Sequence, residues 1–557
     1  MPPATKAEIL ERAAIALSLA NFCFLTIWRE ILHVASEQRF LYLLGTRPDP
    51  LLFWALLLDV AVLAAVLFGL LSLCSSNSRP PKLAATIILG LICLFATYQC
   101  QSYFNGIFYG VISFRSILVL RIILAAAIVF LIIRWPKRVL PGARSFALLL
   151  SPLFFIFMAQ GLWLYYGANS PRLTPKHVAG MLPAKASHGR VIWIIFDELD
   201  YRLVFEARPT RIQLPQFDAL RRTSIFADHV KAPAHDTLSA IPSLLLSTII
   251  PDNQNVDTFT SPVRVRFSGC SRFVALRSQQ NVFQRVRNLG FNTAVSGWYH
   301  PYCRLFGNDL SECSTAVGTG MALVIPQQLL RKRPFLEKAV YLARWEARSL
   351  PLTGRFHWIA PMPDESRDAR ELHIIKNKAV MEAGARMLRN RKLNFVFLHL
   401  PVPHAPGIWN TRTQSFSTNP QLDYIDNLEL ADRRLGQIRK LLEQTGDWDR
   451  STILVSADHP YRPNLWLENR ASAALPDLLQ GPESEMVRLT DLKWQPYIPF
   501  LLKLPGQKTG IEYHREFNSV LSANLLLAAL QGQIRTPAHA VQWLDAHAAA
   551  SEEKVCR

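Results

Sequence analysis

A chain of 557 residues exceeds the usual size of one domain, so two or more folded units are expected. Half of the residues are hydrophobic, and five long apolar stretches precede residue 167, which indicates a membrane protein. The formal net charge of +19 is of a kind that binds nucleic acid, but a basic domain tethered outside a membrane meets anionic headgroups or acidic glycans instead, so nucleic acid is excluded as a partner.

The five apolar stretches each approach the roughly 20 residues that cross a bilayer. They are Ala13–Trp28, Leu51–Cys74, Leu83–Tyr98, Ser116–Ile133 and Ser145–Tyr166. A cleavable signal peptide is not expected, because the first stretch lacks a small-residue cleavage site and is followed by further spans. Residues 1–167 are therefore predicted to form an all-α transmembrane domain with five helices.

The orientation of these spans follows from Lys and Arg in the short loops, which stay preferentially in the cytoplasm. Eight basic residues fall on the side of the N-terminus and four on the other side. The eight are Lys6, Arg12, Arg79, Lys82, Arg134, Lys137, Arg138 and Arg144, and the four are Arg29, Arg39, Arg47 and Arg115. We expect a multi-pass protein of the cytoplasmic membrane, with its N-terminus inside and everything after Tyr166 on the periplasmic or extracellular side.

The exported part begins with a linker. Residues 168–190 are rich in Pro, Ser, Lys and Gly, and residues 191–557 follow as the exported domain. Cys303 and Cys313 bracket a short loop in this part, where oxidation is permitted, so they suit a disulfide. The basic run Arg331–Arg333 lies in an amphipathic segment that either faces the membrane or is a solvated helix face.

Strands and helices alternate along the exported domain. Strands are predicted at 191–196, 225–230, 291–296, 393–406, 451–457 and 499–505, and helices at 214–222, after 236, at 281–290, 423–444 and 517–530, with 320–390 mostly helical. This alternation predicts an α/β domain whose largely parallel sheet is sandwiched by helices.

Polar side chains follow two of the buried strands. Asp197 and Glu198 end the first, and Asp458 and His459 end the strand at 451–457. In open α/β sheets, ligands collect beyond the carboxyl ends of the strands, and oxygen and imidazole ligands of this kind suit Zn²⁺ or Mn²⁺. The alternative for the first pair is a helix cap. Together the pairs predict one divalent metal ion, with Glu198 either joining the metal site or supporting its neighbour.

Two further residues are candidates for the chemistry. Thr237 stands in a turn that opens a helix, and a Thr hydroxyl is a weak nucleophile unless a cation lowers its pKa. Thr237 is therefore the candidate nucleophile and a further metal ligand, with an ordinary helix cap as the alternative. His404 is held between prolines in an extended loop, which suits a general acid or a ligand.

The sequence signal for residues that would contact a substrate anion is weaker than that for the metal ligands. His300 and Arg304 follow the strand at 291–296, and ordinary loop packing is their alternative. His399 lies in the strand before His404, where a supporting or structural role is the alternative.

Taken in order, the strand ending in Asp197, Thr237, a His-x-Pro loop and the strand ending in Asp458-His459 make about residues 190–530 resemble the sulfatase branch of the alkaline phosphatase superfamily. With the preceding spans, the whole chain resembles membrane-anchored phosphoethanolamine transferases and lipoteichoic acid synthases. The nucleophilic Thr of these transferases stands five residues before a Pro, as Thr237 does before Pro242. Their His-x-x-x-x-His-x-Pro loop is matched by His399, His404 and Pro406.

The chain also departs from these families. Sulfatases carry Cys-or-Ser-x-Pro-x-Arg, and nothing near Thr237 has that pattern, so standard sulfate-ester hydrolysis is disfavoured. The transferases usually follow Asp-His with Gly-Glu-Ser and a further histidine, whereas Pro460-Tyr461-Arg462-Pro463 follows here. Arg462 is our candidate for replacing the missing positive element at the substrate.

The resemblance implies three alternatives. The first is a metal-dependent transferase that moves a phosphoethanolamine or phosphoglycerol group from a membrane phospholipid to an envelope glycan through a covalent Thr237 intermediate. The second is a hydrolase that uses the same site as a phosphodiesterase or an unusual sulfatase. The third is a non-catalytic envelope protein that retains the fold.

Overall fold

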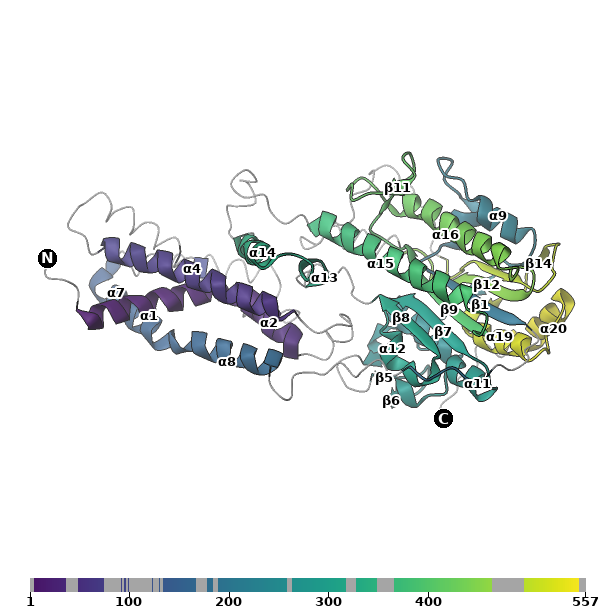
Figure 1. The fold of residues 1–557 in the computed structure, drawn as a ribbon, viewed down its shortest axis with the longest axis horizontal. Helices are drawn as coiled ribbons and strands as arrows, with labels where there is room; N and C mark the ends of the chain where they lie inside the picture. The colour runs from purple at the N-terminus through teal and green to yellow at the C-terminus, as the bar shows by residue number, and fades with distance from the viewer. Residues whose placement is uncertain are drawn as a thin grey trace. The chain divides into compact units, whose positions relative to one another are not determined.

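The structure is a computed structural model that describes residues 5–36, 49–74, 134–166, 178–183, 189–257, 263–316, 327–347, 365–462 and 495–549, with a few single residues between 92 and 130. The chain separates into two compact units (Figure 1). The helical unit comprises Met1–Glu37, Arg47–Arg172 and Gln327–Pro363, and the sheet unit comprises Gln38–Thr46, Leu173–Pro326 and Asp364–Arg557.

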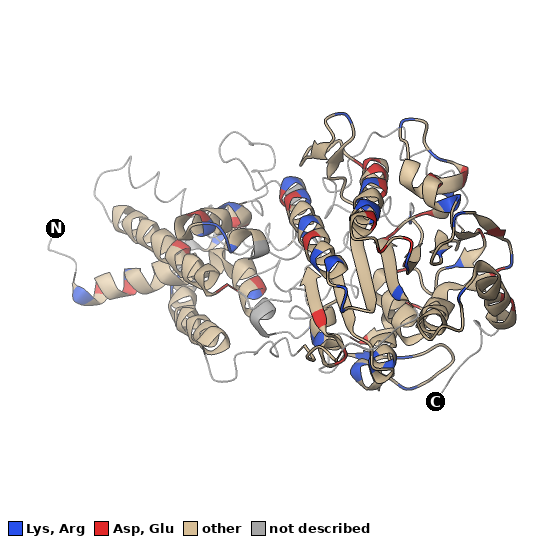
Figure 2. Ribbon diagram, turned by 45° about the vertical axis from the view of Figure 1, so that its right-hand side comes forward, with Lys and Arg blue, Asp and Glu red and all other residues tan. Residues whose placement is uncertain are grey.

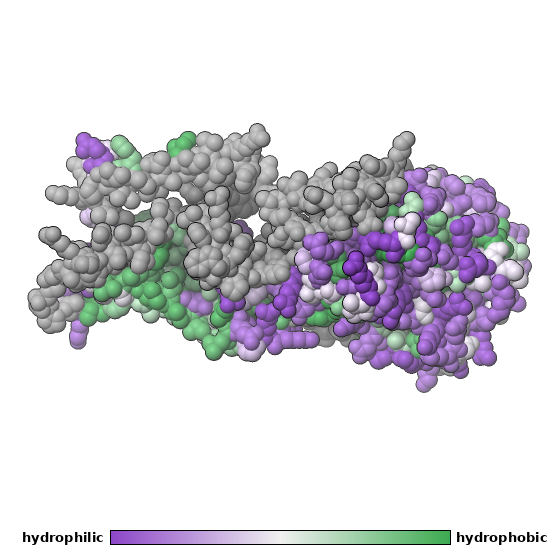
Figure 3. Space-filling model, turned by 90° about the horizontal axis from the view of Figure 1, so that it is seen from above, coloured by the Kyte–Doolittle hydropathy of each residue, from purple (hydrophilic) through white to green (hydrophobic). Residues whose placement is uncertain are grey.

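The helical unit carries the candidate membrane helices. Its helices are α1 (Lys6–Cys23), α2 (Leu25–Ser36), α4 (Pro50–Cys74), α7 (Pro136–Leu150), α8 (Pro152–Tyr166), α13 (Gln327–Leu330) and α14 (Phe335–Ala347). Pro50–Cys74 and Arg144–Tyr166 are each long and apolar enough to cross a membrane, and Lys6–Cys23 with Leu25–Leu32 forms a third candidate that is bent by 64°. Figure 3 shows hydrophobic residues gathered on the surface of these N-terminal helices.

The prediction of five spans is therefore supported in part. The first, second and fifth predicted stretches coincide with the three candidates, although the first is broken at Phe24. The stretches at 83–98 and 116–133 lie, apart from a few residues, outside the described residues. Within the part of the chain that the structure describes, two helices, or three with the bent pair, could cross a membrane, compared with the five that were expected.

Residues 327–347 belong to the helical unit by their contacts, although the sequence places them in the range predicted for the exported domain. Helix α14 packs against α4, and the buried ammonium of Lys338 pairs there with the Asp49 carboxylate. Arg331 and Lys332, which precede α14, are exposed. Their predicted contact with the membrane, with a solvated face as the alternative, stays a prediction.

The sheet unit is built on eight described strands in the order β14-β2-β13-β12-β1-β9-β7-β8. Their bounds are β1 (Arg190–Asp197), β2 (Ile225–Ala227), β7 (Thr293–Trp298), β8 (Glu312–Ala316), β9 (Phe395–Pro403), β12 (Ser451–Ala457), β13 (Phe500–Lys503) and β14 (Ile511–Tyr513). Strand β13 runs antiparallel to both of its neighbours, and the other seven share one direction. The predicted α/β class with a largely parallel sheet is confirmed.

Helices cover both faces of this sheet (Figure 1). On one face, α9 (Pro215–Arg221), α15 (Glu365–Arg389) and α16 (Tyr424–Gln444) pack together, and on the other, α10 (Thr237–Leu246), α11 (Val282–Asn288) and α19 (Ser522–Leu530) do so. The short helix α12 (Tyr302–Leu305) follows β7, and α20 (Pro537–His547) packs on α19. Since β1 is buried along Val191–Asp197 and pairs on both sides, it needs an apolar side chain at nearly every position.

Smaller strands complete the unit and correct two boundaries. They are β3 (Val230–Lys231) with β15 (Phe517–Asn518), β10 (Trp409–Asn410) with β11 (Ser415–Phe416), and β4 (Val256–Asp257), β5 (Arg264–Val265) and β6 (Val274–Ala275). The helix predicted from Phe517 begins only at Ser522, because Phe517 pairs with Val230 in a strand. The strand predicted at 225–230 is likewise divided between β2 and β3.

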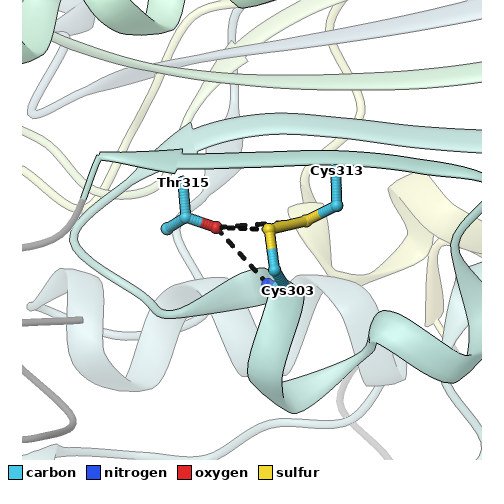
Figure 4. Close-up of a disulfide and its surroundings, with 3 residues drawn as sticks. All are labelled: Cys303, Cys313 and Thr315. Carbon is cyan, nitrogen blue, oxygen red and sulfur yellow. Dashed lines mark hydrogen bonds between the residues drawn. A yellow bond between two sulfur atoms is a disulfide. The ribbon is translucent and has the colours of Figure 1, made fainter. Parts of the chain in front are cut away.

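The predicted disulfide between Cys303 and Cys313 is confirmed. It ties α12 to the edge strand β8, and the Thr315 hydroxyl oxygen lies 2.9 Å from the Cys303 sulfur and accepts from the Cys303 N–H at 3.3 Å (Figure 4). The bond therefore fixes the segment that leaves the carboxyl end of β7.

Candidate active site

Strand register brings the predicted metal ligands together. Because β1 and β12 run parallel with Phe196 opposite Ala457, the residues that follow them, Asp197 and Asp458, emerge at the same height. The N–H of Glu198 donates to Asp458 Oδ1 at 3.0 Å, across 260 positions of sequence. The two strand ends are thus joined directly.

Glu198 adopts a backbone conformation that a residue with a side chain rarely takes. Its φ is +65°, in the left-handed region, which costs of order 1 kcal/mol or more. The Tyr424 hydroxyl holds this turn, since it donates to the Glu198 carbonyl at 2.6 Å and accepts from the Asp200 N–H at 3.2 Å. Strain at this position accompanies the turn that aims the Glu198 N–H at Asp458.

The ligand atoms of Asp197, Asp458 and His459 all lie within 4.8 Å of one another, and the three residues are buried. His459 Nδ1 lies 3.0 Å from the Pro460 carbonyl, which can only accept, so Nδ1 carries the ring proton. Nε2 then presents its lone pair to the cluster, 3.6 Å from Asp458 Oδ2 and 4.0 Å from Asp197 Oδ1. All three side chains therefore offer acceptor atoms to one point.

The electrostatics of this cluster call for a cation. Burial, and then the charge of Asp458, raises the pKa of Asp197 well above its usual value, while burial lowers the pKa of His459 well below its usual value. Asp458 Oδ2 is buried without a hydrogen-bond partner among the described residues. Buried carboxylates are costly unless they are paired or coordinate a metal, so these residues fit a divalent cation. The choice between Zn²⁺ and Mn²⁺ stays a prediction.

Thr237 lies against two of these three residues, Asp197 and His459. Asp236 caps α10 by accepting from the Ser239 N–H at 2.9 Å, which places Thr237 in the first turn. The Thr237 hydroxyl oxygen is 3.3 and 3.4 Å from the two carboxylate oxygens of Asp197 and 3.2 Å from His459 Nε2. The predicted nucleophile therefore stands where a shared cation would contact it.

His300 contacts the backbone of the predicted nucleophile. Its Nε2 donates to the Thr237 carbonyl at 2.8 Å, and burial lowers the pKa of His300 to about 3, so the ring is neutral. The contact holds the turn that presents the threonine, and a direct contact of His300 with a substrate anion stays a prediction. Arg304 lies in α12, and its predicted role likewise stays a prediction.

The two predicted histidines of the β9 loop differ in accessibility. His399 is buried, its Nδ1 lies 2.7 Å from the Tyr302 hydroxyl and its Nε2 lies 3.4 Å from Asp197 Oδ2. Burial lowers the pKa of His399 to about 4. His404 is partly exposed, its Nδ1 donates to the Ala405 carbonyl at 2.5 Å, and its Nε2 lies 4.0 Å from Glu198 Oε2. His404 is therefore the better placed of the two to meet a substrate.

Arg462 lies beside the acids. Its backbone N–H and its Nε are 3.3 and 3.4 Å from Glu198 Oε1. Burial alone would lower the pKa of Arg462, but the charges of Glu198, Asp197, Asp458 and Asp236 outweigh it and raise that pKa. One guanidinium thus faces four carboxylates, which leaves negative charge for a cation to balance. The predicted roles of Glu198 as a metal ligand and of Arg462 as a substrate contact stay predictions.

Three residues that hold the site were missed from the sequence: Tyr302, Tyr424 and Asn427. Asn427 Nδ2 lies 3.3, 3.0 and 3.0 Å from the carbonyls of Pro403, His404 and Pro406, so one amide carries the His404 loop. The available signal was an amide on the apolar face of the helix at 423–444. Such an amide looks the same in a sequence whether or not it anchors a loop.

Comparisons with known proteins add similarity of shape only. No protein-family model and no curated protein matches the sequence. Among solved structures, "Ps i-CgsB" has a TM-score of 0.40 at 14% identity, over 66% of this chain and 77% of that one. A protein of the alkaline phosphatase superfamily from Vibrio parahaemolyticus has a TM-score of 0.36 at 13% identity, over 66% and 72%. The lipoteichoic acid synthase LtaP from Listeria monocytogenes has 0.36 at 13%, over 63% and 76%.

These names include the superfamily that the motifs resemble. With TM-scores below 0.5, however, the likenesses carry no weight for the chemistry, which rests on the geometry of Asp197, Thr237, Asp458 and His459.

Proposed function

We propose that this chain is a membrane-anchored, metal-dependent transferase. It moves a phospho-substituent of the phosphoethanolamine or phosphoglycerol type from a membrane phospholipid to an envelope glycan. The observation that carries the proposal is the Thr237 hydroxyl oxygen, buried within 3.4 Å of Asp197 and 3.2 Å of His459. A structural threonine has no need of a buried carboxylate and an imidazole lone pair beside its hydroxyl.

The residues divide the work of one displacement. Asp197, Asp458 and His459 would hold the divalent cation, which would supply the positive charge that lowers the pKa of the Thr237 hydroxyl and offsets the negative charge of the phosphodiester. The hydroxyl proton is directed toward the Asp197 carboxylate, to which Thr237 donates. The Thr237 oxygen forms a bond to phosphorus as the bond to the leaving alcohol breaks, and His404 gives that alcohol a proton.

The second half of the reaction reverses the first. The hydroxyl of the accepting glycan takes the place of the departed alcohol, gives its proton to His404 and attacks phosphorus. The bond from phosphorus to Thr237 breaks, and the Thr237 oxygen takes back its proton from Asp197. If water takes that place instead, the same site acts as a phosphodiesterase. His300 and Asn427 contribute by positioning, the first on Thr237 and the second on the His404 loop.

The location of the reaction follows from the membrane helices. Apolar helices tether the sheet unit to the bilayer that contains the proposed donor, and the loop charges favour the periplasmic or extracellular side. The Cys303–Cys313 disulfide supports an oxidising compartment.

The test is the mass of the intact full-length protein in detergent after incubation with membrane phospholipids. We expect an added mass on Thr237 equal to the transferred group, absent from the Thr237→Ala variant. Full turnover of phospholipid donors by Thr237→Ala would refute the proposal. Faster cleavage of aryl sulfates than of aryl phosphodiesters would favour an unusual sulfatase, and a protein with neither bound metal nor adduct would be the non-catalytic alternative.

A further inference from the structure

A second polar set lies at the same edge of the sheet, on the side of β7 and β9. Trp298 ends β7, and its ring centroid is 5.2 Å from the His404 ring and 5.7 Å from the His373 ring, which stacks on it at 29°. Lys376, one helical turn beyond His373, places Nζ 5.8 Å from the Trp298 ring centroid. Both His373 and Lys376 come from α15, the helix that carries several basic residues in Figure 2.

The two side chains of this set that can only donate, Trp298 and Lys376, are both buried. Trp298 is 4% exposed, and its Nε1, which can only donate, has no hydrogen-bond partner among the described residues. Lys376 is 3% exposed, and in the described part of the chain it forms no ion pair. A buried ammonium without a counter-charge costs several kcal/mol. Accordingly, burial lowers the pKa of Lys376 to about 7.

The neighbours of Lys376 do not supply the missing negative charge. His373 donates from Nε2 to the Pro401 carbonyl at 2.7 Å, and burial, with the charges of His404, Lys376 and Arg370, lowers the pKa of His373 to about 3. The ionisable groups that act on this imidazole are thus all cationic. A lysine kept for an internal salt bridge would have a carboxylate here.

We propose that Lys376 and Trp298 form a subsite for an oxyanion, a carboxylate or a phosphate, carried by the leaving or accepting alcohol of the substrate. The subsite rests on the proposed function, because the anion that it binds belongs to the alcohol whose oxygen exchanges a proton with His404. Trp298 links the two, since its ring lies beside both His404 and the Lys376 ammonium. The carboxylate or phosphate of an alcohol bound in this way forms an ion pair with Lys376 and accepts a hydrogen bond from the Trp298 indole N–H.

The test compares matched leaving groups. Methyl nitrophenyl phosphodiesters are prepared with a carboxylate on the nitrophenol ring, with a methylene phosphonate there, and with the neutral methyl ester of the carboxylate. The full-length protein, loaded with Zn²⁺ or Mn²⁺, is assayed with each. We expect kcat/KM about tenfold higher for at least one charged ester than for the neutral one, and the stronger of the two identifies the anion.

Three variants locate the effect. Lys376→Met preserves side-chain volume, and we expect it to remove the preference for charge while leaving the neutral ester within about twofold of wild type. Trp298→Phe keeps a ring but removes Nε1, and we expect a smaller loss of preference. Lys378→Met is the matched control, because Lys378 lies on the same helix but is exposed, with Nζ 5.0 Å from the Phe416 ring centroid. It keeps the preference.

A second measurement does not depend on turnover. Acetic anhydride labels lysines, and mass spectrometry follows Lys376 and Lys378 with and without the non-cleavable methylphosphonate analogue of the charged ester. We expect the analogue to slow labelling of Lys376 several-fold and not that of Lys378. A preference that survives in Lys376→Met, an equal loss on charged and neutral esters, or unprotected labelling would overturn the subsite. Absence of turnover with protected labelling would contradict the proposed function and keep the subsite.

Discussion

The two halves of the sheet edge differ in the kind of polar atom that they leave buried. Beyond β1 and β12 the atoms are acceptors, namely the carboxylates of Asp197 and Asp458 and the Nε2 lone pair of His459. Beyond β7 and β9, Trp298 Nε1 is a buried donor without a partner among the described residues, and the buried Lys376 supplies a second donor. Buried polar atoms require partners, so the first half calls for a cation and the second for an anion. The contrast assigns a direction to the site, with nucleophile and cation on one side and the charged alcohol on the other.

The largest expected effect comes from removing the nucleophile of the acceptor half. Thr237→Ala should lower kcat on an aryl phosphodiester on the order of 10³-fold or more, because it removes the hydroxyl that forms the covalent intermediate. Thr237→Ser should retain a measurable part of the rate. The control is bound metal, which the Asp197, Asp458 and His459 ligands should still hold in both variants. An alanine variant with most of its activity would remove the threonine from the mechanism.

The next effect tests the cation itself. Asp458→Asn removes a buried charge that has an unpaired oxygen, and metal affinity should fall roughly 100-fold, with activity following it. Metal content after dialysis, measured by mass spectrometry, checks this. Asp432→Asn is the control, since Asp432 is also a buried carboxylate but accepts from the Gln216 and Phe217 N–H groups at 2.9 Å, away from the cluster. Equal metal loss in both variants would contradict a site at Asp458.

A smaller effect separates the two halves. Asn427→Ala frees the loop that presents His404, so kcat should fall about 10- to 100-fold through misplacement of the proton donor. Metal content should not change, because Asn427 touches none of the acceptor half. Asn419→Ala, which removes an amide that caps an exposed turn, should leave the rate unchanged. Loss of metal in the Asn427 variant would mean that the halves are not independent.

The last effect is on stability rather than on rate, and it concerns the donor half. The pKa of Lys376 is about 7 in the folded protein and near the ordinary value of roughly 10 when unfolded. Between these values the unfolded chain binds a proton that the folded chain does not, so wild-type stability rises with pH across this window. Lys376→Met should therefore stabilise the protein by on the order of a few kcal/mol below pH 7.

This stabilisation by Lys376→Met should shrink as the pH approaches 10, which thermal unfolding in detergent measures. The neighbouring His373 contributes little to the change, because its lowered pKa keeps it neutral throughout the window. A difference between the variant and wild type that is independent of pH would show that the ammonium is not buried at a cost.

The acceptor half could be predicted from the sequence because its residues stand at recognisable places. Asp197 and Asp458 follow runs of buried strand residues, and Thr237 opens a helix, so each has a local signal. Parallel pairing then carries the strand ends to one edge, which is a general property of the fold. The expected α/β class and the Cys303–Cys313 pairing follow from equally local patterns.

The donor half gave no such signal. Lys376 lies within a long stretch that is predicted only as helical. The sequence alone does not distinguish a buried lysine from an exposed one. The reversed direction of β13 and the edge strand β8 depend on tertiary pairing, which the residues of those short segments do not specify. Asn427 is found only when the three carbonyls that it supports are in place.

The most direct test of the account is an anomalous difference map from crystals of the full-length protein loaded with Zn²⁺ or Mn²⁺. We predict one peak beyond the carboxyl ends of β1 and β12, within coordination distance of Asp197, Asp458, His459 and the Thr237 oxygen. Metal-saturated crystals without a peak at that point, or with the ion held by other residues, would contradict the central claim that a cation beside Thr237 activates its hydroxyl.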